Sequence, residues 1–155
     1  MRENMGLYRG KRTKDGVWSE GPLMFVEDKP AIYDQNDTDI SAVWDYGEAR
    51  LCGCYEVDPE TVGQFTGLSD LHGNKIFEGD FIKIRFESDS FTHPYEPIVF
   101  YDIAKVFWSS EHYGWYAAFA SGEELSMWEY DDPHDVEIVG NIHDNPELLG
   151  EKHDC

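Results

Sequence analysis

Alternation of apolar and polar residues marks the most regular segments of the chain as β-strands. In residues 81–86, Ile82, Ile84 and Phe86 fall on one face and the two basic residues between them on the other. Residues 97–108 are largely apolar on both faces, which predicts a long strand that is buried, bent or shared between two packing layers. Runs rich in aromatic and β-branched residues predict further strands at 23–26, 52–57, 62–66, 115–119, 125–128 and 136–139.

Two tight turns are predicted between these strands. At the first, the carboxylate of Asp70 can accept backbone N–H groups and Gly73 admits a positive φ. At the second, Gly79 and Asp80 offer the same two properties immediately before the strand at 81–86. Turn signals recur about every 8–12 residues from Val62 onward, which predicts a small barrel or sandwich.

Helix signals are few. The segment from Asn145 to Gly150 has an Asn at the N-cap, Pro146 at the first helical position and Gly as the stop, which predicts one short helix. The spacing of Val43 and Trp44 after Ile40 predicts a second short helix within residues 37–49. Residues 28–45 form the most polar segment and are predicted to be largely loop.

Composition narrows the class of protein. The 155 residues and 17.9 kDa fit one domain or one domain with a small appendage. The 23 aromatic side chains argue for a packed core, because disordered acidic chains have few. There is no apolar run of about 18 residues to cross a membrane, and no apolar secretory segment near the N-terminus. The three cysteines, Cys52, Cys54 and Cys155, are expected to be reduced thiols, which indicates a cytoplasmic protein.

Charge is distributed unevenly along the chain. Thirty-two acidic residues against twelve Lys and Arg give a net charge of −20, which argues against general nucleic-acid binding. Residues 1–20 are nevertheless basic, whereas residues 106–151 contain eleven acidic residues and no Lys or Arg. The two ends are therefore complementary in charge, and a head-to-tail contact between copies would bring the basic end of one copy to the acidic region of another.

No segment carries a recognisable catalytic or ligand-binding motif. The glycines at 63 and 67 lack the Gly-Lys-Ser/Thr end of a phosphate loop, and the Cys52–Cys54 pair has no second pair to complete a zinc site. The acidic and histidine side chains near Asp70 and His72 have no apolar pocket to perturb them. We therefore expect a protein that is not an enzyme and that has no metal or cofactor.

Rings and carboxylates are interleaved in the C-terminal third. Such a pattern is typical of a protein-docking surface with an aromatic centre and a polar rim, although the same rings would also serve a barrel core. The predicted docking residues are Trp115, Tyr116, Glu123, Glu124, Trp128, Tyr130, Asp131 and Asp132.

Two segments together resemble the YopX family. The first runs from residue 57 to 80 and contains Gln64-Phe65-Thr66-Gly67-Leu68 followed by Ile76-Phe77-Glu78-Gly79-Asp80. The second is the tail at residues 136–149. The resemblance implies a phage- or prophage-borne protein with an SH3-like barrel region and without an assigned activity, and therefore a bacterial host cell as the place where the protein is found. With the strand pattern it predicts a mainly β fold: a β-rich N-terminal extension (1–58), an SH3-like barrel (59–145) and a short helical turn and tail (146–155).

The sequence leads to one functional hypothesis and one alternative. The first is a phage or prophage accessory protein that acts through protein–protein contact, as a homo-oligomer and with a basic phage or host protein as a further partner. The alternative is an acidic DNA mimic that occupies a host DNA-binding enzyme. A membrane partner is not expected, and neither is direct binding of nucleic acid through the basic, ring-containing N-terminus.

Overall fold

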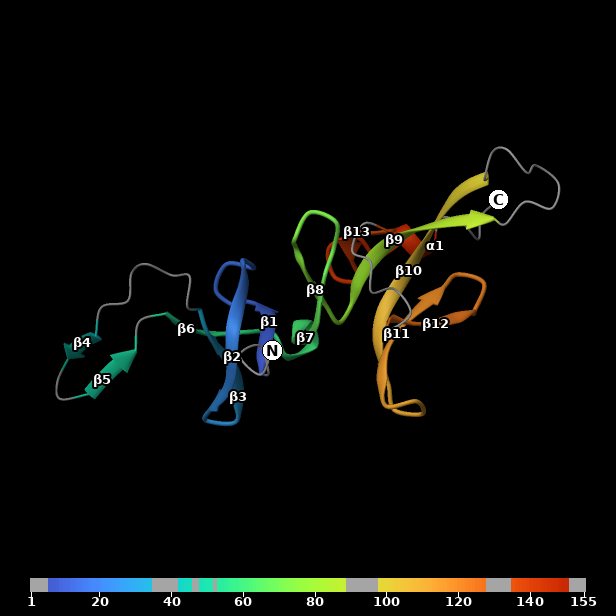
Figure 1. Cartoon of the computed structure of the whole chain (residues 1–155). Coiled ribbons are helices and arrows are strands. Elements are labelled where there is room, and N and C mark those ends of the chain that lie inside the picture. The colour runs from blue at the N-terminus through green and yellow to red at the C-terminus, as the bar shows by residue number, and fades with distance from the viewer. Residues whose placement is uncertain are drawn as a thin grey trace. The chain divides into compact units, whose positions relative to one another are not determined.

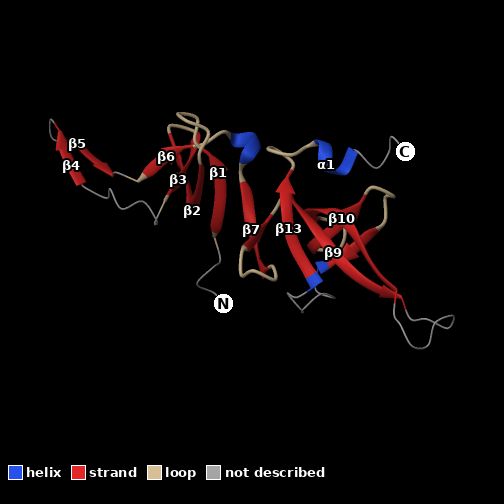
Figure 2. Cartoon of the chain, turned by 90° about the horizontal axis from the view of Figure 1, so that it is seen from above, coloured by secondary structure: helices blue, strands red, loops and turns tan. Residues whose placement is uncertain are grey.

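The structure is a computed structural model, and it describes residues 6–34, 42–45, 48–51, 53–88, 98–127 and 135–150. Most of its regular elements are β-strands (Figure 1; Figure 2). This confirms the prediction of a mainly β protein. The elements in chain order are β1 (Leu7–Lys11), β2 (Trp18–Val26), β3 (Lys29–Tyr33), β4 (Ala42–Asp45), β5 (Glu48–Leu51), β6 (Cys54–Glu56), the 3₁₀ turn η2 (Pro59–Thr61), β7 (Gly63–Ser69), β8 (Lys75–Phe77), β9 (Asp80–Ser88), β10 (Ile98–Ser109), β11 (Gly114–Phe119), β12 (Glu124–Ser126), β13 (Val136–Asn141) and the short helix α1 (Glu147–Gly150).

The chain divides into two compact units, residues 1–65 and 66–155, called here the N-terminal unit and the C-terminal unit. Strand β7 begins in the first unit, where Gln64 pairs with Tyr8 of β1, and ends in the second, beside β8. The N-terminal unit carries thirteen acidic and seven basic residues, a net charge of −6. The C-terminal unit carries nineteen acidic and five basic residues, a net charge of −14.

The N-terminal unit is an antiparallel sheet in which β1, β2 and β3 are consecutive neighbours and β6 pairs with β3. Its buried apolar side chains include Ala31, Ile32 and Val57. Strand β2 runs so close to β3 that a Cβ on Gly21 would lie 1.8 Å from the carbonyl oxygen of Tyr33. Only glycine fits there, because any side chain would overlap the backbone of β3.

The C-terminal unit is a five-stranded antiparallel sheet with the order β12-β11-β10-β9-β13. The strand alternation read from the sequence is confirmed, because Ile82 and Ile84 of β9 are fully buried on one face. They pack in a core that also contains Val106, Trp115 and Val136. The opposite face carries the charged residues Lys83 and Arg85 of β9 and Glu137 of β13.

Both predicted turns are confirmed. The Asp70 carboxylate accepts the N–H groups of His72 (3.0 Å) and Asn74 (2.9 Å), and Gly73 has a φ of 80°. At the second turn Gly79 has a φ of 89°, and the buried carboxylate of Asp80 accepts the N–H of Phe77 at 2.8 Å. The first turn joins β7 to β8, and the second joins β8 to β9 of the five-stranded sheet.

Three expectations are corrected. The helix predicted within residues 37–49 is wrong in its described parts, because β4 and β5 pair there with Trp44 opposite Ala49; Val43 and Trp44 follow their strand propensity. The polar segment at 28–45 contains β3, which gains its hydrogen bonds from β2 and β6. The SH3-like barrel is not confirmed: among the described strands, β12 and β13 are the edges of an open sheet, and closure needs pairing between the edges.

Candidate functional site

The strand β11 separates the first two predicted docking residues onto opposite faces of its sheet. Trp115 faces the core, is 8% exposed, and meets Trp108 edge-to-face with 5.2 Å between ring centroids. Tyr116 faces the other side, half-buried between the rings of Phe107 (6.3 Å) and His112 (5.1 Å). Trp115 therefore has little surface left for a partner, whereas Tyr116 retains part of its ring.

Glu123 and Glu124 are exposed and lie beside a groove of about 240 Å³ in the C-terminal unit. A tight turn after β11 brings them there: the N–H of Gly122 donates to the carbonyl of Phe119, and the N–H of Phe119 to the carbonyl of Glu123, both at 2.9 Å. We call this hollow the phenylalanine groove. It is lined by Phe86, Phe100, Asp102, Phe119, Glu123, Glu124 and Leu125.

Three phenyl rings form the floor of the phenylalanine groove. Phe86 of β9 and Phe100 of β10 are directly opposite each other in the antiparallel ladder, so their rings stack at 5.2 Å with planes 17° apart. Phe119 of β11 meets Phe86 at 5.9 Å in a tilted arrangement. Phe100 remains 48% exposed, whereas Phe119 is buried, so Phe100 is the most accessible ring of the floor.

The rim of the phenylalanine groove is acidic. Asp102 and the two glutamates supply three carboxylates, and none of the seven lining residues is basic. The carboxylate of Asp102 is held in part by the backbone of the next residue, because it accepts the N–H of Ile103 at 2.9 Å. Aromatic faces carry negative quadrupole charge, so rings and carboxylates both favour a cation. The groove is thus suited to a group with an apolar stem and a positive head.

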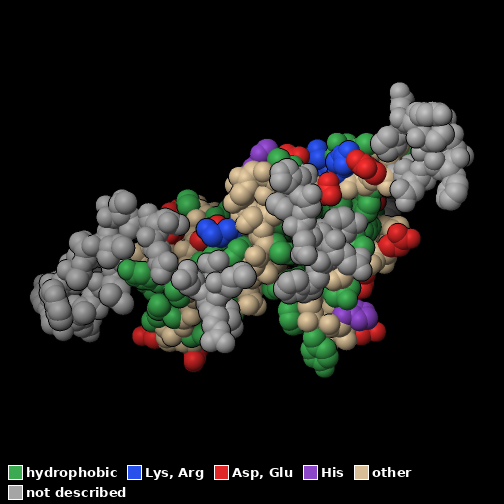
Figure 3. Space-filling model, viewed as in Figure 1, with side chains coloured by type: hydrophobic (Ala, Val, Ile, Leu, Met, Phe, Trp, Pro, Cys, Tyr) green, Lys and Arg blue, Asp and Glu red, His purple; other side chains and the backbone are tan. Residues whose placement is uncertain are grey.

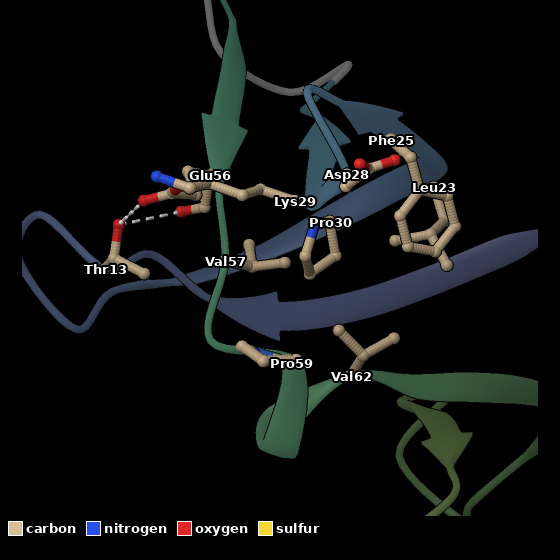
Figure 4. A pocket seen from close by; sticks show the side chains of 10 residues that line it. All are labelled: Thr13, Leu23, Phe25, Asp28, Lys29, Pro30, Glu56, Val57, Pro59 and Val62. Atoms are coloured by element: carbon tan, nitrogen blue, oxygen red, sulfur yellow. Dashed lines mark hydrogen bonds and ion pairs between the residues drawn. The ribbon is translucent and has the colours of Figure 1, made fainter.

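A second, larger hollow lies in the N-terminal unit and holds about 570 Å³ (Figure 4). We call it the hairpin groove, because the β2–β3 hairpin supplies half of its wall. It is lined by Thr13, Leu23, Phe25, Asp28, Lys29, Pro30, Glu56, Val57, Pro59 and Val62.

Three of the polar side chains of the hairpin groove gather at one end. The Thr13 hydroxyl donates to the Glu56 carboxylate at 2.9 Å, and Lys29 Nζ lies 3.5 Å from the same carboxylate. In Figure 4 these three side chains lie on the left, whereas Leu23 and Phe25 stand together on the right. Asp28 adds a second carboxylate beside Phe25, and the remaining lining residues are apolar. Unlike the phenylalanine groove, this groove therefore contains both a basic residue and acidic residues in its lining.

The basic side chains near the N-terminus are engaged inside their own unit. The Arg12 guanidinium lies 3.6 Å from the centre of the Tyr55 ring and donates to Ser19 (2.6 Å) and Asp34 (3.2 Å). Arg9 and Lys11 both lie over the ring of Trp18, at 4.7 and 5.3 Å. This cluster stabilises β1 against β2 and leaves less positive charge for a contact between copies.

Charges on the outer face of the C-terminal sheet are largely paired with one another. Lys83 Nζ lies 3.3 Å from a Glu137 carboxylate that also approaches His72 Nε2 at 3.7 Å, and Arg85 approaches Asp135 at 3.8 Å. Basic and acidic side chains meet in this way on the surface seen in Figure 3. The phenylalanine groove, by contrast, has acidic groups and no basic lining residue.

Part of the predicted docking surface lies outside the described residues, namely Trp128, Tyr130, Asp131 and Asp132. The sequence did not single out Phe86, Phe100, Asp102 or Phe119 as site residues. The alternation in residues 81–86 and 97–108 was the sequence signal that could have indicated these rings. That Phe86 lies opposite Phe100 could be known only from the register between the two strands.

The described residues contain neither a cluster of three or more His, Cys, Asp or Glu that would hold a metal ion nor a helix long and apolar enough to cross a membrane.

The comparisons with known proteins concern family and fold. A family model described as YopX protein matches residues 17–150. The crystal structure of protein EF1440 from Enterococcus faecalis is similar, with a TM-score of 0.51 and 22% sequence identity over 92% of this chain and 96% of that one. At this identity the likeness shows the fold alone. A search of curated proteins gave no match.

Proposed function

The chain belongs to the YopX family, and we propose that it is a phage or prophage accessory protein that acts by binding other proteins. The phenylalanine groove is the surface that best supports this function. It combines an aromatic floor, in which Phe100 is exposed, with three carboxylates, and protein-binding surfaces typically have an aromatic centre and a polar rim. The partner we propose is a basic segment of another protein.

An arginine or lysine side chain would use both parts of the groove. Its methylene stem would lie on Phe86 and Phe100, and its charged head would reach Glu123 or Glu124. Each contact is weak alone: a solvent-exposed cation–π contact contributes about 0.5–1 kcal/mol, and an exposed ion pair about 0–1 kcal/mol. Binding therefore requires several residues of the partner at once.

A labelled twelve-residue peptide of alternating arginine and leucine tests this proposal by fluorescence anisotropy. Replacing Glu123 and Glu124 together by Gln is expected to weaken binding about tenfold, because two ion pairs are lost. The charge-matched control is Glu111→Gln with Glu147→Gln, two exposed glutamates of the same unit that do not line the groove. Equal losses in the two double variants would mean that only the overall negative charge attracts the peptide.

Self-association is the second part of the proposal. A head-to-tail contact through the basic N-terminus has less support, because Arg9, Lys11 and Arg12 interact with Trp18, Tyr55 and Asp34 of their own unit. A different surface would have to join the copies. Sedimentation velocity across a range of protein concentrations tests this part, and a monomer at every concentration would contradict it.

An acidic DNA mimic is a second candidate function, favoured by the net charge of −14 in the C-terminal unit. Competition with duplex DNA for basic host proteins at low salt tests it. A mimic needs no aromatic floor, so Phe100→Ser would leave such competition unchanged but would weaken binding of the basic peptide.

A further inference from the structure

The tip of the β2–β3 hairpin exposes apolar side chains. Phe25 is 69% exposed and its neighbour Val26 is 52% exposed, the first toward the hairpin groove and the second toward a smaller hollow beside Cys54. Removing apolar side chains of this kind from water is energetically favourable. Two consecutive exposed apolar residues at a strand end therefore mark a candidate contact surface.

The backbone holds this tip in a defined position. Val26 pairs with Lys29, so only Glu27 and Asp28 form the turn, with φ angles of 52° and 65°. Such a type I′ turn matches the twist of the strands but normally uses Asn and Gly, because positive φ is unfavourable for residues with a side chain. The hairpin thus presents Phe25 on a backbone that is paired with β3, where Phe25 lies opposite Pro30.

The hairpin groove begins directly beside the exposed ring. Phe25 and Leu23 form one wall, and Val57, Pro59 and Val62 are among the other apolar lining residues (Figure 4). Its volume of about 570 Å³ exceeds that of the phenylalanine groove at about 240 Å³. One surface of this unit therefore contains both an exposed apolar projection and an apolar hollow.

We propose that this surface joins two copies of the chain, with Phe25 of each copy seated in the hairpin groove of the other. The proposal rests on the self-association put forward above and is independent of basic-peptide binding in the C-terminal unit. A twofold contact requires a patch that is complementary to itself, and a projection beside a hollow meets that requirement.

The charges of the region favour a second copy over the basic partner. Lys29 and the acidic tip residues Glu27 and Asp28 are all exposed on the same hairpin. Lys29 also lies 3.5 Å from Glu56 of its own chain in a solvent-exposed ion pair, so in a twofold arrangement it can share its charge with the acids of the other copy. The N-terminal unit also carries the smaller net charge, −6 against −14, so its approach to a second copy costs less repulsion.

Salt dependence separates this contact from a charge-driven one. Two copies with a net charge of −20 each repel, and the proposed contact is mostly apolar, so raising the salt concentration should strengthen it. A head-to-tail contact between basic and acidic regions should weaken instead. Binding of the arginine peptide to the phenylalanine groove should weaken as well, so the two proposals fail independently.

Sedimentation velocity of the full chain at about 50 and 500 mM NaCl provides the test. The wild-type protein is expected to dimerise, more tightly at the higher salt. Phe25→Ser should raise the dimer dissociation constant about a hundredfold, because the change occurs twice in a symmetric contact. Pro59→Glu, which places a carboxylate in the groove wall at an exposed position, should have a similar effect.

Tyr113→Ser is the matched control, because Tyr113 is an 83% exposed ring at a positive-φ position of the other unit. It should dimerise as the wild type does, and circular dichroism should show that all three variants are folded. A wild-type monomer at every concentration, tighter association at low salt, or equal dimerisation of Phe25→Ser and wild type would each overturn the proposal.

Discussion

The N–H of Ile138 donates a hydrogen bond to the carboxylate of Asp70 at 3.1 Å, although the two residues are 68 positions apart. The same carboxylate closes the β7–β8 turn through His72 and Asn74. One side chain, only 2% exposed, therefore fixes both a local turn and the strand β13. The turn was predictable from Asp70 and Gly73, but the bond to β13 was not.

Replacing Asp70 by Asn should destabilise the protein by about 2–3 kcal/mol, because an amide group cannot replace both carboxylate oxygens as acceptors of three N–H groups. Urea unfolding at neutral pH measures the loss. Asp15→Asn is the control, since Asp15 is exposed and accepts the N–H of Val17 within its own turn. Losses of equal size would contradict a special role for Asp70.

The stabilisation from Asp70 should depend on pH. Burial raises its pKa, but the hydrogen bonds from Ile138, Asn74 and His72 outweigh burial and hold the pKa below its ordinary value of 3.8. A lowered folded-state pKa gives stability that is present above the unfolded-state pKa and is lost as the pH falls through the folded one. The wild type should therefore lose stability more steeply than Asp70→Asn between about pH 4 and pH 2. Parallel curves would show that Asp70 does not contribute to the acid transition.

Gly21→Ala should destabilise the N-terminal unit by at least about 3 kcal/mol, because the new Cβ would overlap the backbone of Tyr33 and force β2 and β3 apart. Hydrogen exchange of the β2 and β3 amide groups measures this. Gly16→Ala is the control: its φ is 72° but no atom lies within 4 Å of the added Cβ, so a cost of about 1 kcal/mol is expected. Similar effects of the two changes would contradict the close approach of the strands.

The two tryptophans that touch each other should respond differently to truncation. Trp115→Ala should cost about 3–5 kcal/mol, because it leaves a cavity in the core of the C-terminal unit. Trp108→Ala should cost less than half of that, since Trp108 is 47% exposed. Thermal unfolding followed by circular dichroism distinguishes them. Equal costs would mean that Trp115 is not the buried member of the pair.

Replacing Glu27 by Asn and Asp28 by Gly should stabilise the β2–β3 hairpin by about 1 kcal/mol, because both new residues tolerate the positive φ of a type I′ turn. Chemical denaturation measures the gain. The exposed ring of Phe25 stays in place in this variant. A loss of stability would indicate that the side chains of Glu27 and Asp28 make contacts that outweigh the relief of strain.

Local patterns predicted most of the strands because each pattern reflects a local cause. Alternation places Ile82 and Ile84 on one face, and the Asp and Gly residues of the two turns act on backbone atoms only a few positions away. The segment around Val43 is an exception. A few apolar residues there fit a helical spacing, yet their β propensity and a partner strand decided the outcome.

Only part of the candidate site could be predicted from the sequence. Glu123 and Glu124 were predicted as docking residues and line the phenylalanine groove, whereas Trp115 of the same prediction is buried. The rings of the groove come from β9, β10 and β11, and they meet because Phe86 is paired with Phe100 and not with a residue one place away. A shift of one residue would turn each ring to the opposite face.

By itself, the sequence determined the β class, the acidic surplus, the two Asp–Gly turns and the family, since these depend on composition and on neighbours along the chain. Only the tertiary structure decided which rings are buried, which basic residues are already engaged, and where the two grooves lie. Those properties depend on strand register and on contacts between residues far apart in sequence, and no local pattern encodes either one.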